Sequence, residues 1–197
     1  GISYDPELWE NQLSDIGCVV EGTDEEGVEI EVFPDRSDLL SVETMTRAAR
    51  AFLYSNPTPP KLEVELGTIT MEIESSISTI RPVILGAIVR NVNIGTTEEE
   101  KDLFIQSLMD HQEKLHHTLG RKRRLASIGV HDLSTLAPPF KVKAVNRDHR
   151  FVPLAMNSSM SVQQILDSHP KGMEYAHLLD GMDLVPIIED AVGRTLS

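Results

Sequence analysis

Cysteine is nearly absent from this chain, which carries only Cys18 among its 197 residues. A single cysteine cannot form an internal disulfide, so a disulfide-stapled secreted fold is excluded and a reducing cytoplasm is the expected compartment. The chain lacks any run of about 18 apolar residues, so no membrane-spanning helix and no membrane partner are predicted. We recognise no signal peptide. Because the sequence begins with Gly1 rather than methionine, we expect a fragment of a longer protein.

Several catalytic motifs are also missing. The sequence contains no GxGxxG, P-loop or HExxH pattern, and no serine lies in a GxSxG turn, so a covalent hydrolase is unsupported. His111, His116 and His117 do not have the i,i+3 or i,i+4 spacing that paired ligands on a helix need. We therefore predict no metal site. Cys18 lies in a predicted strand, where we expect it to be buried and inert.

Basic residues are scarce in the first part of the chain and concentrated later. Residues 1–80 hold four Lys/Arg against seventeen Asp/Glu, whereas residues 81–197 hold fourteen of each, and the whole chain has a formal net charge of −13. Within the second part, residues 111–150 hold nine Lys/Arg against three Asp/Glu. The overall acidity therefore does not exclude nucleic acid, because phosphate binding depends on where cations cluster; a solvated basic face is the alternative.

Hydrophobic periodicity predicts an α+β fold with interspersed elements and no βαβ rhythm. The first part is predicted to hold a helix at 5–16, a hairpin of strands 18–21 and 28–33, and a helix at 39–53 with Asp38 as its N-cap. Three prolines in residues 55–60 predict a linker. Strands are then expected at 62–66 and 69–73, followed by an apolar central strand at 83–94.

The second part contains the clearest helix signal, at 97–119. Thr97 and Glu100 form a capping box, Gly120 ends the pattern, and Phe104, Leu108, Leu115 and Leu119 are expected to form a buried stripe. Further strands are predicted at 125–128, 140–145 and 184–188, and further helices at 161–168 and 172–179. The capped helix leads into the cations Arg121, Lys122, Arg123 and Arg124, which exceed what a helix end needs for its dipole. With Gln112 and His116 on one helical stripe, the residues alone indicate a basic polar pocket or face, and they indicate no particular reaction.

Segments spread over most of the chain resemble one protein family. They are EVFPDRSDLLSVETMTRAARAF at 31–52, IRPVILGAIVRNV at 80–92, HQEKLHHTLGRKRRLASIGVHDL at 111–133, APPFKVKAV at 137–145, FVPL at 151–154, HPKGMEYAHLL at 169–179 and VPI at 185–187. In this order they resemble the β subunit of phenylalanyl-tRNA synthetase of the archaeal/eukaryotic type. The match to the family's continuation stops at the GRTLS end of the sequence.

The resemblance implies a small N-terminal helix/hairpin domain at 1–80, followed by the first part of a mixed-sheet editing domain at 81–197. It implies a phenylalanine–tRNA ligase subunit that binds the phenylalanine tRNA and hydrolyses tyrosine wrongly attached to it. The synthetase α subunit would be the partner in a heterotetramer, and ATP and magnesium would serve charging in that holoenzyme, with no cofactor in this fragment. Much of the editing-pocket wall that recognises tyrosine is expected to lie outside the 197 residues.

Roles implied by the resemblance fall on a small set of residues. Gln112 and Arg123 would hold the terminal adenosine and a water network, His131 would line the same pocket, and Asp132 would either orient His131 or cap the following turn. The tRNA phosphates would be contacted by Arg121, Lys122 and Arg124. Asp35, Arg36 and Asp38 are expected to hold the N-terminal domain together. Two alternatives stay open: a non-catalytic module for assembly or tRNA docking, and a stand-alone nucleic-acid-binding domain.

Overall fold

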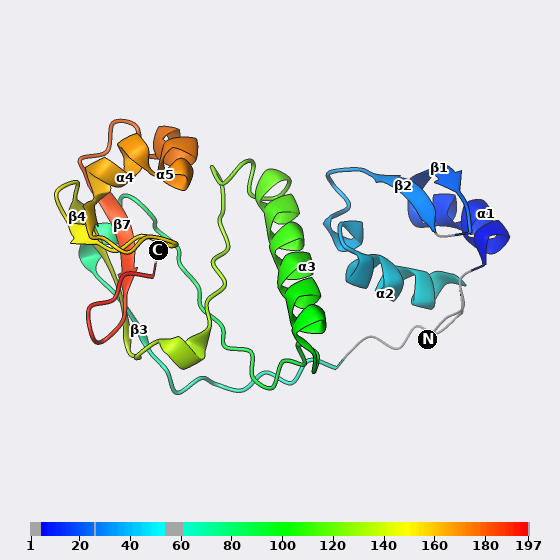
Figure 1. Cartoon of the computed structure of the whole chain (residues 1–197), viewed down its shortest axis with the longest axis horizontal. Coiled ribbons are helices and arrows are strands. Elements are labelled where there is room, and N and C mark those ends of the chain that lie inside the picture. The colour runs from blue at the N-terminus through cyan, green and yellow to red at the C-terminus, as the bar shows by residue number, and fades with distance from the viewer. Residues whose placement is uncertain (1–4, 26, 54–60, 197) are drawn as a thin grey trace. The chain divides into compact units, whose positions relative to one another are not determined.

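The computed structural model describes residues 5–25, 27–53 and 61–196 (Figure 1). Its backbone divides into two compact units, the first comprising residues 1–63 and 92–128, the second residues 64–91 and 129–197. The domain boundary predicted at residue 80 stays a prediction, and the linker predicted at 55–60 lies outside the described residues. Among the described residues, no helix combines the length and the apolar character needed to cross a membrane.

The first unit opens with helix α1 (Pro6–Ile16) and an antiparallel hairpin of β1 (Cys18–Thr23) and β2 (Val28–Val32). Asp5 caps α1 by accepting a hydrogen bond from the amide of Leu8 at 3.1 Å. Gly17 ends the helix with φ 100°, a left-handed conformation that glycine adopts without steric cost. These elements confirm the predicted helix and hairpin.

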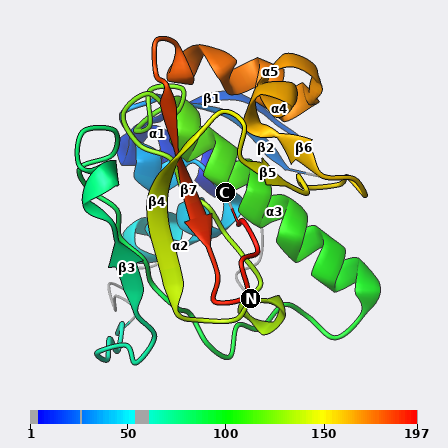
Figure 2. The same ribbon diagram turned by 90° about the vertical axis from the view of Figure 1, so that its left-hand side faces the viewer.

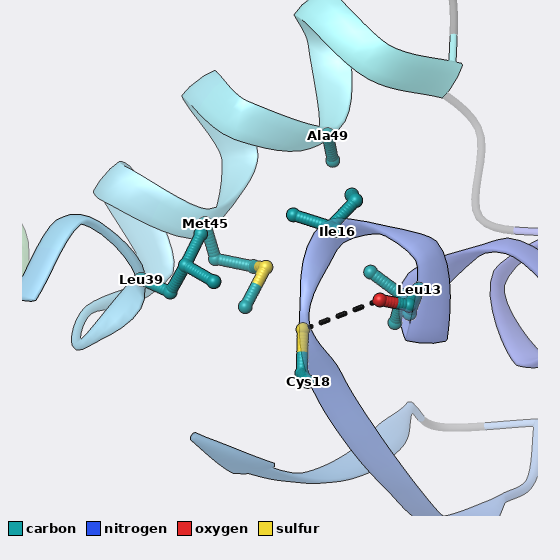
Figure 3. Packing of buried hydrophobic residues seen from close by; sticks show 6 residues of the cluster. All are labelled: Leu13, Ile16, Cys18, Leu39, Met45 and Ala49. Atoms are coloured by element: carbon teal, nitrogen blue, oxygen red, sulfur yellow. Dashed lines mark hydrogen bonds between the residues drawn. The ribbon is translucent and has the colours of Figure 1, made fainter. Parts of the chain in front are cut away.

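A short 3-10 helix η1 (Ser37–Leu39) and helix α2 (Val42–Leu53) complete the part before the linker. Six residues from these elements form its buried core (Figure 3): Leu13, Ile16, Cys18, Leu39, Met45 and Ala49. Cys18 is buried, as predicted, and its thiol lies 3.5 Å from the carbonyl oxygen of Leu13. Burial raises the pKa of this thiol, and the charge of Arg36 counters that rise only in part, so Cys18 is protonated at neutral pH.

Arg36 ties the end of α1 to the turn before α2. Its guanidinium donates to both carboxylate oxygens of Asp38, at 3.0 and 2.9 Å, and to the carbonyl oxygen of Ile16 at 2.5 Å. The expected structural role of Arg36 and Asp38 is confirmed. The prediction that Asp38 caps the following helix was wrong, because the carboxylate is held by Arg36. Ser41 takes that place and accepts a hydrogen bond from the amide of Thr44 at 3.2 Å.

The long helix α3 (Glu98–His117) also belongs to the first unit. Its capping box is confirmed, since Glu100 N donates to Thr97 Oγ1 at 3.2 Å and Thr97 N donates to Glu100 Oε2 at 3.0 Å. The expected buried stripe was wrong: His116 is the buried residue of the helix, and Leu119, just beyond its end, is 57% exposed. Periodicity shows which side of a helix is apolar, but burial requires another element to cover that side.

The second unit is built on a mixed three-stranded sheet of β3 (Met71–Ile73), β4 (Phe140–Asn146) and β7 (Leu184–Glu189) (Figure 2). The central strand is β4, which runs parallel to β3 and antiparallel to β7. The buried apolar residues of this unit are Ile77, Val142, Val162, Val185 and Ile187. Ile77 ends the 3-10 helix η2 (Ser75–Ile77).

The remaining elements of this unit are short. They are η3 (Leu133–Thr135), β5 (Arg150–Phe151), β6 (Met160–Ser161), α4 (Val162–Ser168), α5 (Pro170–Tyr175) and η4 (Ala176–Leu179). Ser161 and Gln164 form a capping box at the start of α4. Arg147 donates to the carbonyl oxygens of Leu179 and Met182 and so fixes the segment after η4.

The α+β class and the mixed sheet agree with the prediction, but three expected strands do not form. Residues 62–66, 83–94 and 125–128 adopt no strand, and the strand expected at 69–73 is reduced to Met71–Ile73. The apolar run at 83–94 was predicted to be the central strand. That prediction was wrong, because β3 and β7 occupy the two edges of β4 and leave no position for a further strand beside it.

Candidate nucleic-acid interface

Residues 111–150 contain nine basic residues, and several of these side chains form ion pairs or hydrogen bonds with other residues of the chain. Lys141 lies 2.7 Å from Glu74, and Lys143 lies 2.6 Å from Glu189. Arg147 donates to two backbone carbonyls, and Lys114 donates to the carbonyl oxygen of Leu40 at 2.9 Å. Cations held in this way fix the fold, so the candidate interface narrows to the segment Arg121–Arg124, called here the basic turn.

The basic turn has an unusual backbone. Arg121, Lys122 and Arg123 have φ values of 47°, 56° and 64°, which place three consecutive residues with side chains in the left-handed region. Each such residue costs roughly 1–2 kcal/mol relative to the right-handed conformation. Hydrogen bonds from Arg123 N to His116 O at 3.3 Å and from Leu125 N to Gly120 O at 2.9 Å hold the turn against the end of α3.

This conformation gives the four cations different surroundings: one is half-buried and three are exposed. Arg123 is half-buried, and its guanidinium forms an ion pair with Glu113 on α3. Arg121, Lys122 and Arg124 are exposed to solvent. One arginine therefore fixes the turn to the helix, while the other three present positive charge outward. Exposed cations on a fixed backbone are suited to binding phosphate groups.

Glu113 also receives a hydrogen bond from a buried histidine. His116 is only 1% exposed, and its Nε2 accepts a hydrogen bond from the amide of Ile128 at 2.8 Å. The same Nε2 lies 3.1 Å from the carbonyl oxygen of Ile128, and Nδ1 lies 3.3 Å from Glu113 Oε1. A carboxylate, an imidazole and a guanidinium are thus joined beneath the basic turn.

Gln112 lies next to this group and anchors the segment that follows the basic turn. Its Nε2 donates to the carbonyl oxygen of Ile128 at 2.9 Å. Within the described residues, Gln112 Oε1 is buried and accepts no hydrogen bond. Gln112 therefore contributes a structural contact, and its buried oxygen is left without a hydrogen-bond donor among the described residues.

Gly120 allows the close packing at the start of the turn. A Cβ at this position would lie 2.6 Å from Ala126 O and 2.7 Å from His116 O. Both oxygens belong to the backbone, so they cannot rotate away as a side chain would. A glycine is therefore required where the chain leaves α3.

His131 and Asp132 belong to the second unit, whereas Gln112 and Arg123 belong to the first. Asp132 Oδ1 accepts hydrogen bonds from the amide and the hydroxyl of Ser134, at 2.9 and 2.8 Å, and these bonds hold the pKa of the carboxyl below its usual value. The capping alternative for Asp132 is confirmed. The imidazole of His131 folds over Gly129, and partial desolvation lowers its pKa, which favours the neutral form.

Sequence reasoning missed Glu113, although it named Gln112, Arg123 and His116. The i,i+3 spacing between Glu113 and His116 was the available signal, but the pairing with Arg123 depends on the backbone of the turn. No group of three His, Cys, Asp or Glu side chains gathers among the described residues. The donors at the basic turn are mostly cationic, and the one carboxylate is engaged, so they do not fit the oxygen ligands that Mg²⁺ prefers.

No protein-family model matches the chain. The phenylalanine–tRNA ligase β subunit of Methanococcoides burtonii is 42% identical over 182 residues, which are 92% of the chain and 33% of that protein. The corresponding subunit of Archaeoglobus fulgidus is 39% identical over 187 residues, 95% of the chain and 33% of that protein. A crystal structure of an N-terminal fragment of the Pyrococcus horikoshii phenylalanyl-tRNA synthetase β subunit matches with a TM-score of 0.77. That match has 27% identity and covers 99% of this chain and 56% of the fragment.

These matches agree in family, and each covers more than nine-tenths of the chain. The chain spans about a third of the length of the curated relatives that it matches. The chain therefore belongs to the family of phenylalanine–tRNA ligase β subunits.

Proposed function

We propose that this chain is the part of a phenylalanine–tRNA ligase β subunit that binds the phenylalanine tRNA and contributes to hydrolytic editing of tyrosine attached to it. The observation that carries this proposal is the basic turn, where three exposed cations stand on a backbone held by Glu113 and Arg123. Family membership points to a tRNA as the substrate, and the basic turn offers a positively charged surface for the phosphates of that tRNA.

An editing reaction has a clear physical reason. Tyrosine differs from phenylalanine by one added hydroxyl, and an apolar pocket rejects such an addition by only about a hundredfold. A second site that hydrolyses the wrong ester supplies the remaining discrimination. An aminoacyl ester is already reactive, so a positioned water and polarising donors suffice without a protein nucleophile.

Each predicted residue takes a role in keeping with its surroundings. Arg121, Lys122 and Arg124 contact tRNA phosphates. Gln112 offers its buried acceptor to the terminal nucleotide or to the water network. Arg123, paired with Glu113 on α3, holds the basic turn in place. His131 lines the editing pocket as a neutral imidazole.

We assign the charging reaction, in which phenylalanine is attached to the tRNA, to another part of the enzyme. The α subunit of the holoenzyme binds ATP and magnesium and forms the phenylalanyl ester, as the resemblance to the family implies. The cytoplasm is the site of action of such an enzyme. An assembly or tRNA-docking module without a role in editing is the second candidate, and the exposed basic turn agrees with docking equally well.

The two candidates differ in which rate the site residues control. In the intact αβ enzyme, Gln112→Ala and Arg123→Ala are expected to slow hydrolysis of Tyr-tRNA by about 10²–10³, an effect as large as that of losing an oxyanion-hole group, because the first removes the contact to the water network and the second releases the basic turn. Formation of Phe-tRNA should be nearly unchanged. Arg50→Ala, an exposed arginine on α2, is the matched control and should affect neither rate. Equal loss of both rates would contradict the editing role and leave docking as the function.

A measurement of tRNA binding tests the three exposed cations independently of the editing reaction. Replacing Arg121, Lys122 and Arg124 by Ala should weaken tRNA binding and reduce the slope of log Kd against log salt by about 0.7–0.9 for each phosphate that the protein no longer neutralises. The Arg50→Ala control should keep the slope of the unchanged enzyme. A triple variant with the full slope would show that the basic turn is only a solvated face.

A further inference from the structure

Glu113 on α3 has no role of its own in the proposed function, although it contacts two residues of the candidate interface. Its Oε1 forms an ion pair with Arg123 Nη2 and lies 3.3 Å from His116 Nδ1. The side chain of Glu113 is 42% exposed, whereas those of Arg123 and His116 are 21% and 2% exposed. One carboxylate oxygen therefore joins the third residue of the basic turn to a buried side chain of the helix that precedes it.

The basic turn needs such a contact because its backbone is unfavourable by itself. Arg121, Lys122 and Arg123 adopt positive φ values one after another, and none of them is a glycine. The hydrogen bond from Arg123 N to His116 O is 3.3 Å long, and so is the bond from Arg124 N to Arg121 O. Hydrogen bonds of this length are weaker than those near 2.9 Å. The charge-assisted contact of the Arg123 side chain therefore supports the turn where its backbone contacts are longest.

The far end of the same segment is held by neighbours of Glu113. Ile128 N donates to His116 Nε2 at 2.8 Å, and Gln112 Nε2 donates to Ile128 O at 2.9 Å. Side chains of α3 thus fix the chain at two points, Arg123 and Ile128. The exposed cations of the basic turn lie beside the first point, which is the one that Glu113 holds.

We propose that Glu113 is a positioning residue for tRNA binding, which acts through Arg123 to hold the three exposed cations of the basic turn in the arrangement that meets the tRNA phosphates. This inference rests on the proposed function, since it takes tRNA phosphates as the ligand. Glu113 binds no phosphate itself, because its carboxylate carries the same sign of charge. Its contribution is to order the turn before tRNA binds, so that less binding free energy is lost in ordering it afterwards.

Charge alone predicts the opposite effect, and this gives the experiment its direction. A carboxylate beside three cations repels phosphates, so removing an acidic residue without a positioning role would strengthen tRNA binding. Removing a positioning residue weakens binding, because the tRNA must then order the turn. Asp110, an exposed acidic residue three positions before Glu113 on α3, is the matched control for charge.

The dissociation constant of tRNA from the intact αβ enzyme tests the proposal. Glu113→Ala is expected to raise Kd by about threefold to tenfold, a modest change because partly exposed ion pairs are weak. Glu113→Gln should also raise Kd, but less, since its amide oxygen still accepts a hydrogen bond from Arg123. Asp110→Ala should leave Kd unchanged or lower it. A Glu113→Ala enzyme that binds tRNA as tightly as the Asp110→Ala enzyme, or more tightly, would overturn the proposal. If Glu113→Ala fails to fold, Glu113→Gln and Asp110→Asn give the same comparison.

A double-mutant cycle tests whether Glu113 acts through Arg123. Arg123→Ala should raise Kd by itself, and adding Glu113→Ala should raise it no further, because the contact between the two residues is already lost. Two effects that multiply would show that the residues act independently, which contradicts the proposal.

The triple replacement of Arg121, Lys122 and Arg124 by Ala separates this inference from the proposed function. A full salt slope in the triple variant would refute phosphate binding by the basic turn, and the positioning role with it. A reduced slope in the triple variant, together with no loss of binding in Glu113→Ala, would refute the positioning role alone.

Discussion

Replacing Gly120 by alanine should damage the basic turn through its backbone. The added Cβ would lie 2.6 Å from Ala126 O, 2.7 Å from His116 O and 3.0 Å from His116 Cα. All three atoms belong to the backbone, so the end of α3 or the turn must shift by several tenths of an ångström. Overpacking of this kind costs about 1–3 kcal/mol, whereas the lower chain entropy of alanine returns about 0.4–1 kcal/mol. The expected net loss of stability is therefore about 1–2 kcal/mol.

The midpoint of urea unfolding measures this loss, and Gly22→Ala is the matched control. Gly22 also lies in the first unit, and a Cβ there would meet nothing within 4 Å, so the control should change stability by no more than about 0.5 kcal/mol. The Gly120 variant should also bind tRNA more weakly, since His116 O and Gly120 O both accept hydrogen bonds from the turn. Unfolding midpoints that coincide for the two variants would refute the steric argument.

Two further predictions concern stability. The amides of Thr97 and Thr96 lower the pKa of Glu100 to about 2, so its contribution is present above about pH 4.5 and is lost as the pH falls toward 2. Glu100→Gln should therefore lose less α3 helicity than the unchanged chain during acid titration by circular dichroism, and parallel titration curves would contradict this. Leu13→Ala should cost about 2–5 kcal/mol in thermal unfolding because Leu13 is 0% exposed, whereas Val42→Ala, at a site 79% exposed, should cost far less.

Elements with local signals were predictable from the sequence. The capping box of Thr97 and Glu100 and the stop at Gly120 involve residues that are close together along the chain. These signals placed α3 close to its observed bounds. The hairpin was predictable for the same reason, because its strands are neighbours in the sequence and alternate in polarity.

Strands that need distant partners were not predictable in the same way. Residues 83–89 have the composition of a strand, but a strand also requires a neighbouring backbone to pair with. The parallel pairing of β3 with β4 joins Met71 to Phe140, far along the sequence, and no local pattern indicates it. Composition therefore predicted a strand at 83–94 that does not form, because composition cannot show whether a neighbouring backbone is in place to pair with the segment.

The candidate site was predictable in its composition but not in its geometry. The cluster of Arg and Lys at 121–124 was evident from the sequence, and so was the stop at Gly120. The sequence could not show that three of these residues adopt left-handed φ values, since that conformation is unfavourable for each one alone. Without it, nothing distinguished Arg123, which pairs with Glu113, from its exposed neighbours.

The left-handed backbone of the basic turn determines how its charges are arranged. A right-handed continuation of α3 would distribute the four cations around the helix, whereas the observed turn reverses the chain and lets Leu125 N return to Gly120 O. One cation is then neutralised by Glu113, and His116 anchors the segment beyond the turn through Ile128. The three remaining cations stay exposed on a backbone that is already ordered. A phosphate backbone that binds there meets a preorganised surface, so less of the binding free energy is lost in ordering the protein.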